Sequence, residues 1–277
     1  MKRLHYDFVF SIGAMCSCSS ALRRGGLQYA SYPFDWILGS DLVGRAKMVA
    51  SEFEGWLEEK DLEIVDSELN RDHVECRNNK TGIVFVHDFP RGKAVGDVFS
   101  EVRAKYERRC RRLVRRCSLS KRILAVYMNS PAYTSPTDDE MLRAHSILAE
   151  KFPEANITLL VMVCRKGISF ERRVKREISD GVILYAYDYE ALEKSFDTNA
   201  VERSKVDALF DLLRISAEDY RSEEERRAHK LSCRMKRYAR FGATSFWGYA
   251  LTRLEYRIFR HLQKHLVRKG VQLEDRR

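Results

Sequence analysis

Tyr6-Asp-Phe-Val-Phe-Ser-Ile-Gly13 is an apolar, β-prone run that stops at a glycine, and Ala14-Met-Cys16-Ser-Cys18 follows it. A segment compatible with a short helix comes next, over residues 19–24. This order predicts a buried strand, a tight turn and then a helix N-terminus beside Cys16. Backbone N–H groups and the positive end of a helix dipole favour the thiolate, which is the reactive form of cysteine. The other interpretation of Cys16 is a small apolar residue buried at the junction.

The first two thirds of the chain alternate between strand-like and helix-like segments. Apolar runs predict further strands over residues 62–65, 82–88, 122–129, 156–164 and 181–188. Helices are predicted over residues 41–59, with Asp41 as the cap, over 98–117 and over 138–152. One apolar stripe runs along the second of these helices and consists of Phe99, Val102, Tyr106, Cys110, Leu113 and Cys117. Continuous apolar strands joined by helices indicate an α/β fold with three layers, a mostly parallel sheet with helices on both faces.

No further strand is expected beyond about residue 190. Helices rich in both charges are predicted over residues 200–213 and 218–240, and an aromatic, basic helix over residues 246–267. We therefore expect an α/β domain over residues 1–195 and a basic helical C-terminal extension over residues 196–277. The apolar side of the last helix would dock on this domain or on a partner, or would attach to a membrane surface.

Composition narrows the partners and the compartment. The 277 residues carry a formal net charge of +10, which favours anionic partners. Seven cysteines are scattered without a CxxC pair, so neither a disulfide framework nor a zinc knuckle is expected. This cysteine usage fits a reducing compartment, and no signal peptide or membrane-spanning run is visible, so a cytoplasmic protein is expected. Nucleic acid is not an expected partner, because no recognised binding module is present.

Residues that can carry chemistry follow the predicted strands. In open α/β sheets the working crevice lies beyond the carboxyl ends of the strands. The residues at or just after these ends are Cys16, then His87 and Asp88, then Asn129, and finally Asp188. Thiol catalysis needs a cysteine nucleophile, a histidine that removes the thiol proton, and an Asn or Asp that orients the imidazole. Ser17 and neighbouring backbone N–H groups would then form the oxyanion site.

Four motifs also carry a resemblance, which covers roughly residues 6–190. They are Ser11-Ile-Gly-Ala-Met-Cys16, Ser31-Tyr-Pro-Phe-Asp-Trp36, His87-Asp-Phe89 and Tyr106-Glu-Arg-Arg109. Together they resemble a bacterial family catalogued as papain-like cysteine peptidases, a domain of unknown function often found near surface-polysaccharide genes.

The resemblance implies that Cys16 is the nucleophile and His87 the base of a thiol-dependent peptidase, acyl or amide hydrolase, or acyltransferase. This scheme requires no cofactor, and its substrate would be an acyl, peptide or glycan-linked molecule, anionic in character. The third catalytic residue stays open between Asn129 and Asp188, with Asp35 behind them. Asp35 lies between two aromatic residues, and its other interpretation is structural, because a buried carboxylate must be hydrogen-bonded.

Several rival interpretations remain. Cys18 and Arg24 fit the C-x5-R pattern of cysteine phosphatases, without the glycines that curl a backbone around phosphate. The arginines of residues 108–116, Arg108 and Arg112 among them, form either a solvated helix face or a surface that steers anionic substrates. His261 and His265 are spaced as metal ligands but lack a third, so no metal is expected. A glycan-related transferase and a non-catalytic, membrane-associated binding module are the alternative functions.

Overall fold

The computed structural model describes residues 4–65, 72–129, 133–189, 209–224 and 226. The chain divides into two compact units, Met1–Asp219 and Tyr220–Arg277, and every element described below belongs to the first. The predicted helix over residues 246–267 lies outside the described residues, as do most of those over residues 200–213 and 218–240. The domain boundary expected at residue 195 also falls in an undescribed range, so it stays a prediction.

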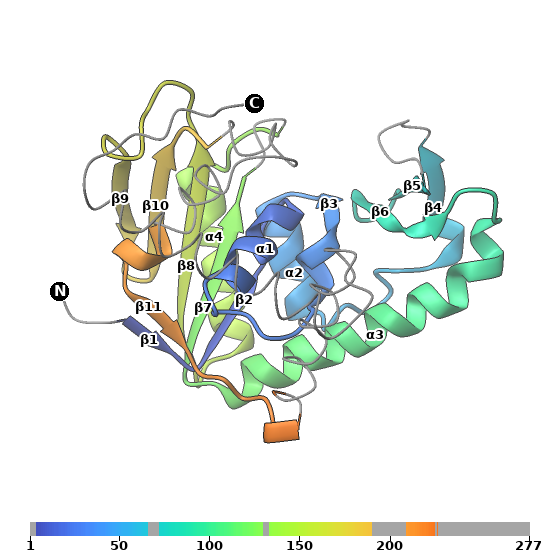
Figure 1. The fold of residues 1–277 in the computed structure, drawn as a ribbon, viewed down its shortest axis with the longest axis horizontal. Helices are drawn as coiled ribbons and strands as arrows, with labels where there is room; N and C mark the ends of the chain where they lie inside the picture. Colours follow the sequence, from blue (N-terminus) through green and yellow to red (C-terminus); the bar gives the residue numbers. More distant parts are fainter. Residues whose placement is uncertain (1–3, 66–71, 130–132, 190–208, 225, 227–277) are drawn as a thin grey trace, which may run out of the picture. The chain divides into compact units, whose positions relative to one another are not determined.

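The main sheet has five strands in the order β2-β7-β8-β10-β9 (Figure 1). Four run parallel, β2 (Phe8–Ser11), β7 (Arg122–Met128), β8 (Asn156–Cys164) and β10 (Val182–Tyr187), and β9 (Val174–Ser179) pairs antiparallel with β10 at one edge. β7 and β8 are buried along most of their length, as their continuous apolar runs predict. The prediction misses β9, because its sequence is polar and the strand lies exposed at the edge.

The strand that carries His87 does not join this sheet. β6 (Ile83–Pro90) lies between β3 (Ile37–Gly39) and β5 (His73–Asn78) in a separate antiparallel sheet, with β4 (Leu62–Val65) beyond β5. The prediction of one mostly parallel sheet containing residues 82–88 is therefore wrong. β6 is apolar because an aromatic cluster covers it: the Phe85 ring lies 5.2 Å from that of Tyr106 and 6.2 Å from that of Trp56.

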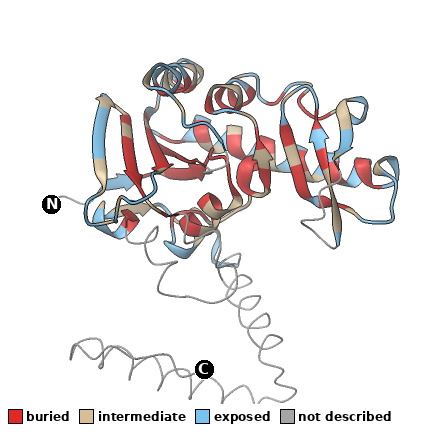
Figure 2. Cartoon of the chain, turned by 90° about the horizontal axis from the view of Figure 1, so that it is seen from above, coloured by how far each residue is buried: buried red, intermediate tan, exposed pale blue. Residues whose placement is uncertain are grey.

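Four helices whose bounds lie within the described residues accompany the main sheet and the antiparallel sheet. α1 (Cys16–Arg24) packs on β2 and β7, and α4 (Asp138–Lys151) packs on β8, β9 and β10, while α2 (Leu42–Ala50) packs on α4. α3 (Val95–Leu119) buries the whole predicted stripe from Phe99 to Cys117. Figure 2 shows that buried residues, in red, occur along both strands and helices of the described part of the chain. α2 ends well before residue 59, because Glu52, Phe53 and Gly55 adopt positive φ angles of 53°, 64° and 56°.

Short elements complete the unit. The 3₁₀ helices η1 (Pro33–Trp36) and η2 (Glu59–Asp61) connect longer segments. β1 (Leu4–Tyr6) pairs in parallel with β11 (Ile215–Ala217). The expectation of no strand beyond residue 190 is therefore wrong, since three residues are too few for a sequence pattern to show. Among the described residues, none of the helices is both long and apolar enough to cross a membrane.

Candidate active site

Cys16 is the first residue of α1, and a tight turn connects it to the end of β2 at Ser11. Its side chain is half-buried, like that of its neighbour Ser17. The N-cap residue Met15 provides no side-chain hydrogen bond to the helix, and the first turn contains no acidic residue. The positive end of the α1 dipole therefore acts on the Cys16 thiol without a side-chain anion in the first turn to offset it. This confirms the predicted position of the thiol at a helix start.

The turn before Cys16 is fixed against β7. Ile12 N–H donates to the Val126 carbonyl at 2.9 Å, and Ala14 N–H donates to the Met128 carbonyl at 3.2 Å, so the pairing continues beyond β2. A Cβ atom on Gly13 would lie 2.5 Å from the Met128 nitrogen, closer than any stable contact. Glycine is therefore required here because the two backbones approach each other closely.

Arg45 is a completely buried arginine that holds the same turn from the other side. Its Nη1 donates to the Gly13 carbonyl at 2.9 Å and to the Ile12 carbonyl at 3.4 Å, and its Nε donates to the Gly39 carbonyl at 3.1 Å. The guanidinium also lies 5.1 Å from the Phe34 ring centroid. Burial lowers the pKa of Arg45 to about 10, so it remains charged at neutral pH.

Sequence reasoning misses Arg45, although one signal was available. Arg45 follows Leu42 by three positions on α2. It therefore lies beside the apolar residues of this helix that face the protein interior. An arginine at such a position must either leave the core or find several acceptors.

Asp35 is also buried, and its hydrogen bonds tie η1 to α1. One carboxylate oxygen accepts from Arg23 at 2.7 Å, from Gln28 at 2.7 Å and from the Tyr32 backbone at 3.0 Å. Ser19 on α1 donates to the Asp35 carbonyl at 3.0 Å. Burial raises the pKa of Asp35, and the Arg23 charge opposes this shift. The structure therefore places the Asp35 carboxylate in a buried network rather than on an open surface.

His87 lies within β6, and its side chain is exposed. The expected meeting of Cys16 and His87 at neighbouring strand ends is wrong, because β6 belongs to the antiparallel sheet. The His87 ring lies edge-on to Trp36, with 6.4 Å between ring centroids, and the Arg23 guanidinium lies 5.4 Å from the same Trp36 ring. Partial burial lowers the pKa of His87, and the charge of the adjacent Asp88 opposes the shift.

The described contacts thus link Cys16 to His87 only through other residues. Arg23 follows Cys16 by seven positions in α1, which is about 10 Å along the helix axis. Within the described part of the chain, no hydrogen bond or ring contact joins His87 directly to Cys16.

Asn129 and Asp188 lie at the carboxyl end of the main sheet, as expected, but at different distances from β2. Asn129 follows β7, which pairs directly with β2, and its Nδ2 donates to the Tyr133 carbonyl at 3.2 Å. Its Oδ1 is buried and has no hydrogen-bond partner among the described residues. Asp188 follows β10, separated from β2 by β7 and β8, so about 14 Å of sheet lies between them. The Asp188 carboxylate accepts from the Gly167 N–H at 2.9 Å.

Asp88 faces α3, and Arg108 and Arg112, the arginines of the predicted steering surface, lie on it. Asp88 is buried and forms an ion pair with Lys105, and it accepts a hydrogen bond from the Tyr106 hydroxyl at 2.8 Å. Burial and the Asp88 charge raise the pKa of Tyr106. Arg108 and Arg112 are exposed, and Arg112 donates to the Ser31 carbonyl at 2.9 Å. Asp88 is therefore engaged with α3 rather than with His87.

The sequence of the chain matches a known protein family. A sequence model of the family described as "Putative papain-like cysteine peptidase (DUF1796)" matches residues 7–167, more than half of the chain. The chain belongs to this family. The matched range includes Cys16, His87 and Asn129 but ends before Asp188, whereas the resemblance was expected to reach residue 190.

One curated relative is viral. "Uncharacterized protein R408" of Acanthamoeba polyphaga mimivirus is 24% identical over 131 residues, which cover 42% of this chain and 59% of the relative. The chain thus spans less than two thirds of that relative. No solved structure matches the chain.

Among the described cysteines of this papain-like family member, only Cys16 and Cys164 are half-buried, and the other four are buried. Burial raises the pKa of Cys18 to about 12 and that of Cys76 to about 11. The Cys18 thiol donates to the Val126 carbonyl at 3.4 Å, and residues 18–24 are helical. The phosphatase-loop interpretation is therefore wrong, because Cys18 is buried and no loop surrounds it. Cys233, His261 and His265 lie outside the described residues, within which no cluster of metal-binding side chains occurs.

Proposed function

We propose that the protein is a thiol-dependent hydrolase of amide bonds in peptides or peptide-like molecules, with Cys16 as its nucleophile. The observation that carries this proposal is the half-buried thiol at the start of α1, where the helix has no side-chain cap. Membership in the papain-like cysteine peptidase family supports it. The fixed turn at Gly13 supports it further, because a nucleophile must be held in one position to react efficiently.

The reaction follows from these groups. Sγ of Cys16 attacks the carbonyl carbon of the amide while its proton passes to a base. Backbone N–H groups at the start of α1, next to Ser17, stabilise the oxyanion that forms. When this intermediate collapses, the carbon–nitrogen bond breaks, the amine leaves with the proton from the base, and a thioester remains on Cys16. Water then cleaves the thioester and restores the thiol.

His87 is the proposed base. Its lowered pKa keeps the imidazole neutral at pH 7, which is the form that accepts a proton. Because the ring lies against Trp36 in this structure, the assignment requires the imidazole to reach Cys16 when substrate is bound. Catalytic hydrogen bonds often form only in the substrate complex.

Asn129 is the better placed of the two candidates for the third residue. It follows the strand next to β2, and its buried Oδ1 has no partner among the described residues, so this oxygen can accept an imidazole N–H. The Asp188 carboxylate already accepts the Gly167 N–H and lies two strands further away. The same thioester would allow acyl transfer if an amine replaced water.

A peptide library tests the proposal without knowledge of the substrate. Wild type, Cys16→Ser and the matched control Cys164→Ser are each incubated with a tryptic digest of a cell lysate, and new peptide termini are identified by mass spectrometry. The expected result is cleavage by wild type and Cys164→Ser, none by Cys16→Ser, and an acid-stable acyl adduct on Cys16 that hydroxylamine removes. Peptide products that gain an amine would identify acyl transfer. Cleavage that persists in Cys16→Ser, or absence of both cleavage and adduct in wild type, overturns the proposal.

A further inference from the structure

A concave site lies between α3 and the turn that follows α2, and Cys16 does not line it. It is an open groove of about 420 Å³, within the range of ligand-binding cavities. None of its lining residues belongs to α1, β2 or η1, the elements that surround the candidate nucleophile. The groove is therefore distinct from the proposed catalytic site.

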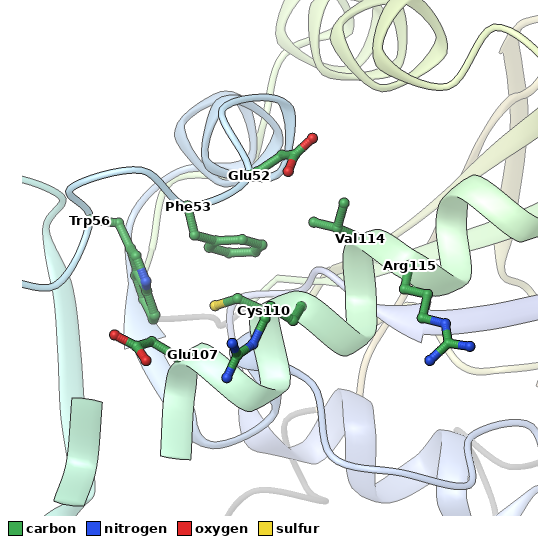
Figure 3. A pocket seen from close by; sticks show the side chains of 8 residues that line it. Glu52, Phe53, Trp56, Glu107, Cys110, Val114 and Arg115 are labelled. Atoms are coloured by element: carbon green, nitrogen blue, oxygen red, sulfur yellow. The ribbon is translucent and has the colours of Figure 1, made fainter. Parts of the chain in front are cut away.

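Both walls of the groove contain apolar side chains. Phe53 and Trp56 come from the turn after α2, and Figure 3 shows the Phe53 ring pointing towards Cys110 and Val114 on α3. The positive φ of Phe53 helps to set this turn. The rings of Phe53 and Trp56 also contact each other, with 5.4 Å between centroids, so this wall is built of packed side chains.

The charged side chains that line the groove differ in whether they have an ionic partner. The Glu52 carboxylate forms an ion pair with Lys151 at 2.7 Å, and the Glu107 carboxylate forms one with Arg103 at 3.1 Å. Arg111 and Arg115 also line the groove, and within the described part of the chain neither has an ion pair or hydrogen bond. Both arginines are exposed, so two positive charges remain available beside an apolar surface.

We propose that this groove binds a short extended segment of a partner polypeptide that carries large apolar side chains and two acidic residues at alternate positions. Arg111 and Arg115 are one helical turn apart, a rise of about 6 Å, and alternate residues of an extended chain are about 7 Å apart. Acidic side chains on one edge of such a segment would meet the arginines, while apolar side chains on the other edge would meet Phe53 and Trp56.

The length of the concave surface fits this occupant. A smaller hollow lined by Leu57, Glu58 and Arg103 shares Phe53, Trp56 and Glu107 with the groove, so the concave surface continues along α3. From Arg103 to Arg115 α3 rises about 18 Å, and an extended pentapeptide spans about 16 Å.

The test measures binding, so its outcome does not depend on the activity of Cys16. The probe is a fluorescein-labelled pentapeptide of alternating leucine and glutamate, and the control probe has lysine in place of glutamate. Fluorescence anisotropy is recorded with the full chain at physiological salt. We expect the glutamate peptide to bind at least about tenfold more tightly than the lysine peptide. Equal affinities for the two peptides overturn the proposal.

Three variants distinguish binding in the groove from attraction by the overall positive charge of α3. Arg115→Glu should weaken binding of the glutamate peptide about tenfold, whereas Arg108→Glu, an exposed arginine that does not line the groove, should change it less than about twofold. Val114→Lys adds a positive charge but fills the groove, so we expect weaker binding. Tighter binding by Val114→Lys, or equal losses in Arg108→Glu and Arg115→Glu, would mean attraction by charge alone and overturn the proposal. Circular dichroism melting confirms that each variant is folded.

Discussion

Nη1 of the buried Arg45 donates a hydrogen bond of 2.9 Å to the carbonyl oxygen of Gly13, three residues before Cys16. A buried cation thus fixes the backbone that leads to the candidate nucleophile. The same guanidinium binds the Gly39 carbonyl, so it joins the first strand–helix turn to β3 in the antiparallel sheet. Two parts of the fold that are far apart in the sequence are held together at one side chain.

Replacement of Arg45 should lower the stability of the whole unit. Arg45→Met would leave the carbonyls of Ile12, Gly13 and Gly39 buried without this donor, and we expect a loss of roughly 3 kcal/mol in the free energy of unfolding. Arg45→Lys keeps the charge but has fewer donors, so its loss should be smaller. Urea denaturation measures both. A change below about 1 kcal/mol for Arg45→Met would contradict the role given to this side chain.

Gly13→Ala should disturb the turn before Cys16, because its Cβ would lie 2.5 Å from the Met128 nitrogen. We expect destabilisation of about 1–3 kcal/mol together with slower alkylation of Cys16. Gly25→Ala is the matched control, since its nearest contact would be an ordinary 3.5 Å at the other end of α1. Thermal unfolding and mass-resolved alkylation give the two readouts. Similar behaviour of the two variants would contradict the close approach at Gly13.

The raised pKa of Asp35 predicts a pH dependence of stability. The folded protein holds the Asp35 proton more tightly than the unfolded chain, whose carboxyl has an ordinary pKa of 3.8. This contribution to stability is therefore complete below pH 3.8 and is lost as the pH rises through the folded-state pKa. The Asp35→Asn variant has no carboxyl group here and cannot lose this contribution. Its free energy of unfolding should therefore increase relative to that of wild type as the pH rises from 4. Urea unfolding at several pH values measures it, and a shift in the opposite direction would contradict the burial of this carboxylate.

The Trp36 ring contributes to the environment of His87. Because partial burial lowers the pKa of His87, Trp36→Ala should raise it towards the ordinary value of 6.5. NMR titration of the imidazole measures this directly, and an exposed histidine such as His5 serves as an internal reference. An unchanged or lower pKa for His87 in the variant would show that Trp36 does not shield it.

The sequence predicts those elements whose burial follows from their own hydrophobic pattern. β7, β8 and β10 have continuous apolar runs, and α3 has one apolar stripe, so period and composition suffice for them. β6 has the same kind of run but pairs antiparallel, and its coverage depends on Trp56 and Tyr106 from distant segments. No local pattern distinguishes these two cases.

The candidate site was predictable to a similar extent. Cys16 was found because strand, glycine, cysteine and helix follow one another directly in the sequence. The relation between Cys16 and His87 was not predictable, because it depends on which sheet β6 joins. The buried positions of Arg45 and Asp35 depend on acceptors and donors such as Gly39 and Gln28, and no sequence spacing identifies these pairs.

The reactivity of Cys16 tests the central claim most directly. Iodoacetamide alkylation of each cysteine is followed against pH by mass spectrometry in wild type and in His87→Ala, with Cys164, which is also half-buried, as internal control. If Cys16 is the nucleophile and His87 its base, Cys16 should react about tenfold faster than Cys164 at neutral pH, and His87→Ala should reduce this advantage. If Cys16 and Cys164 react at the same rate at every pH in both proteins, Cys16 is not an activated nucleophile and the proposed function is wrong.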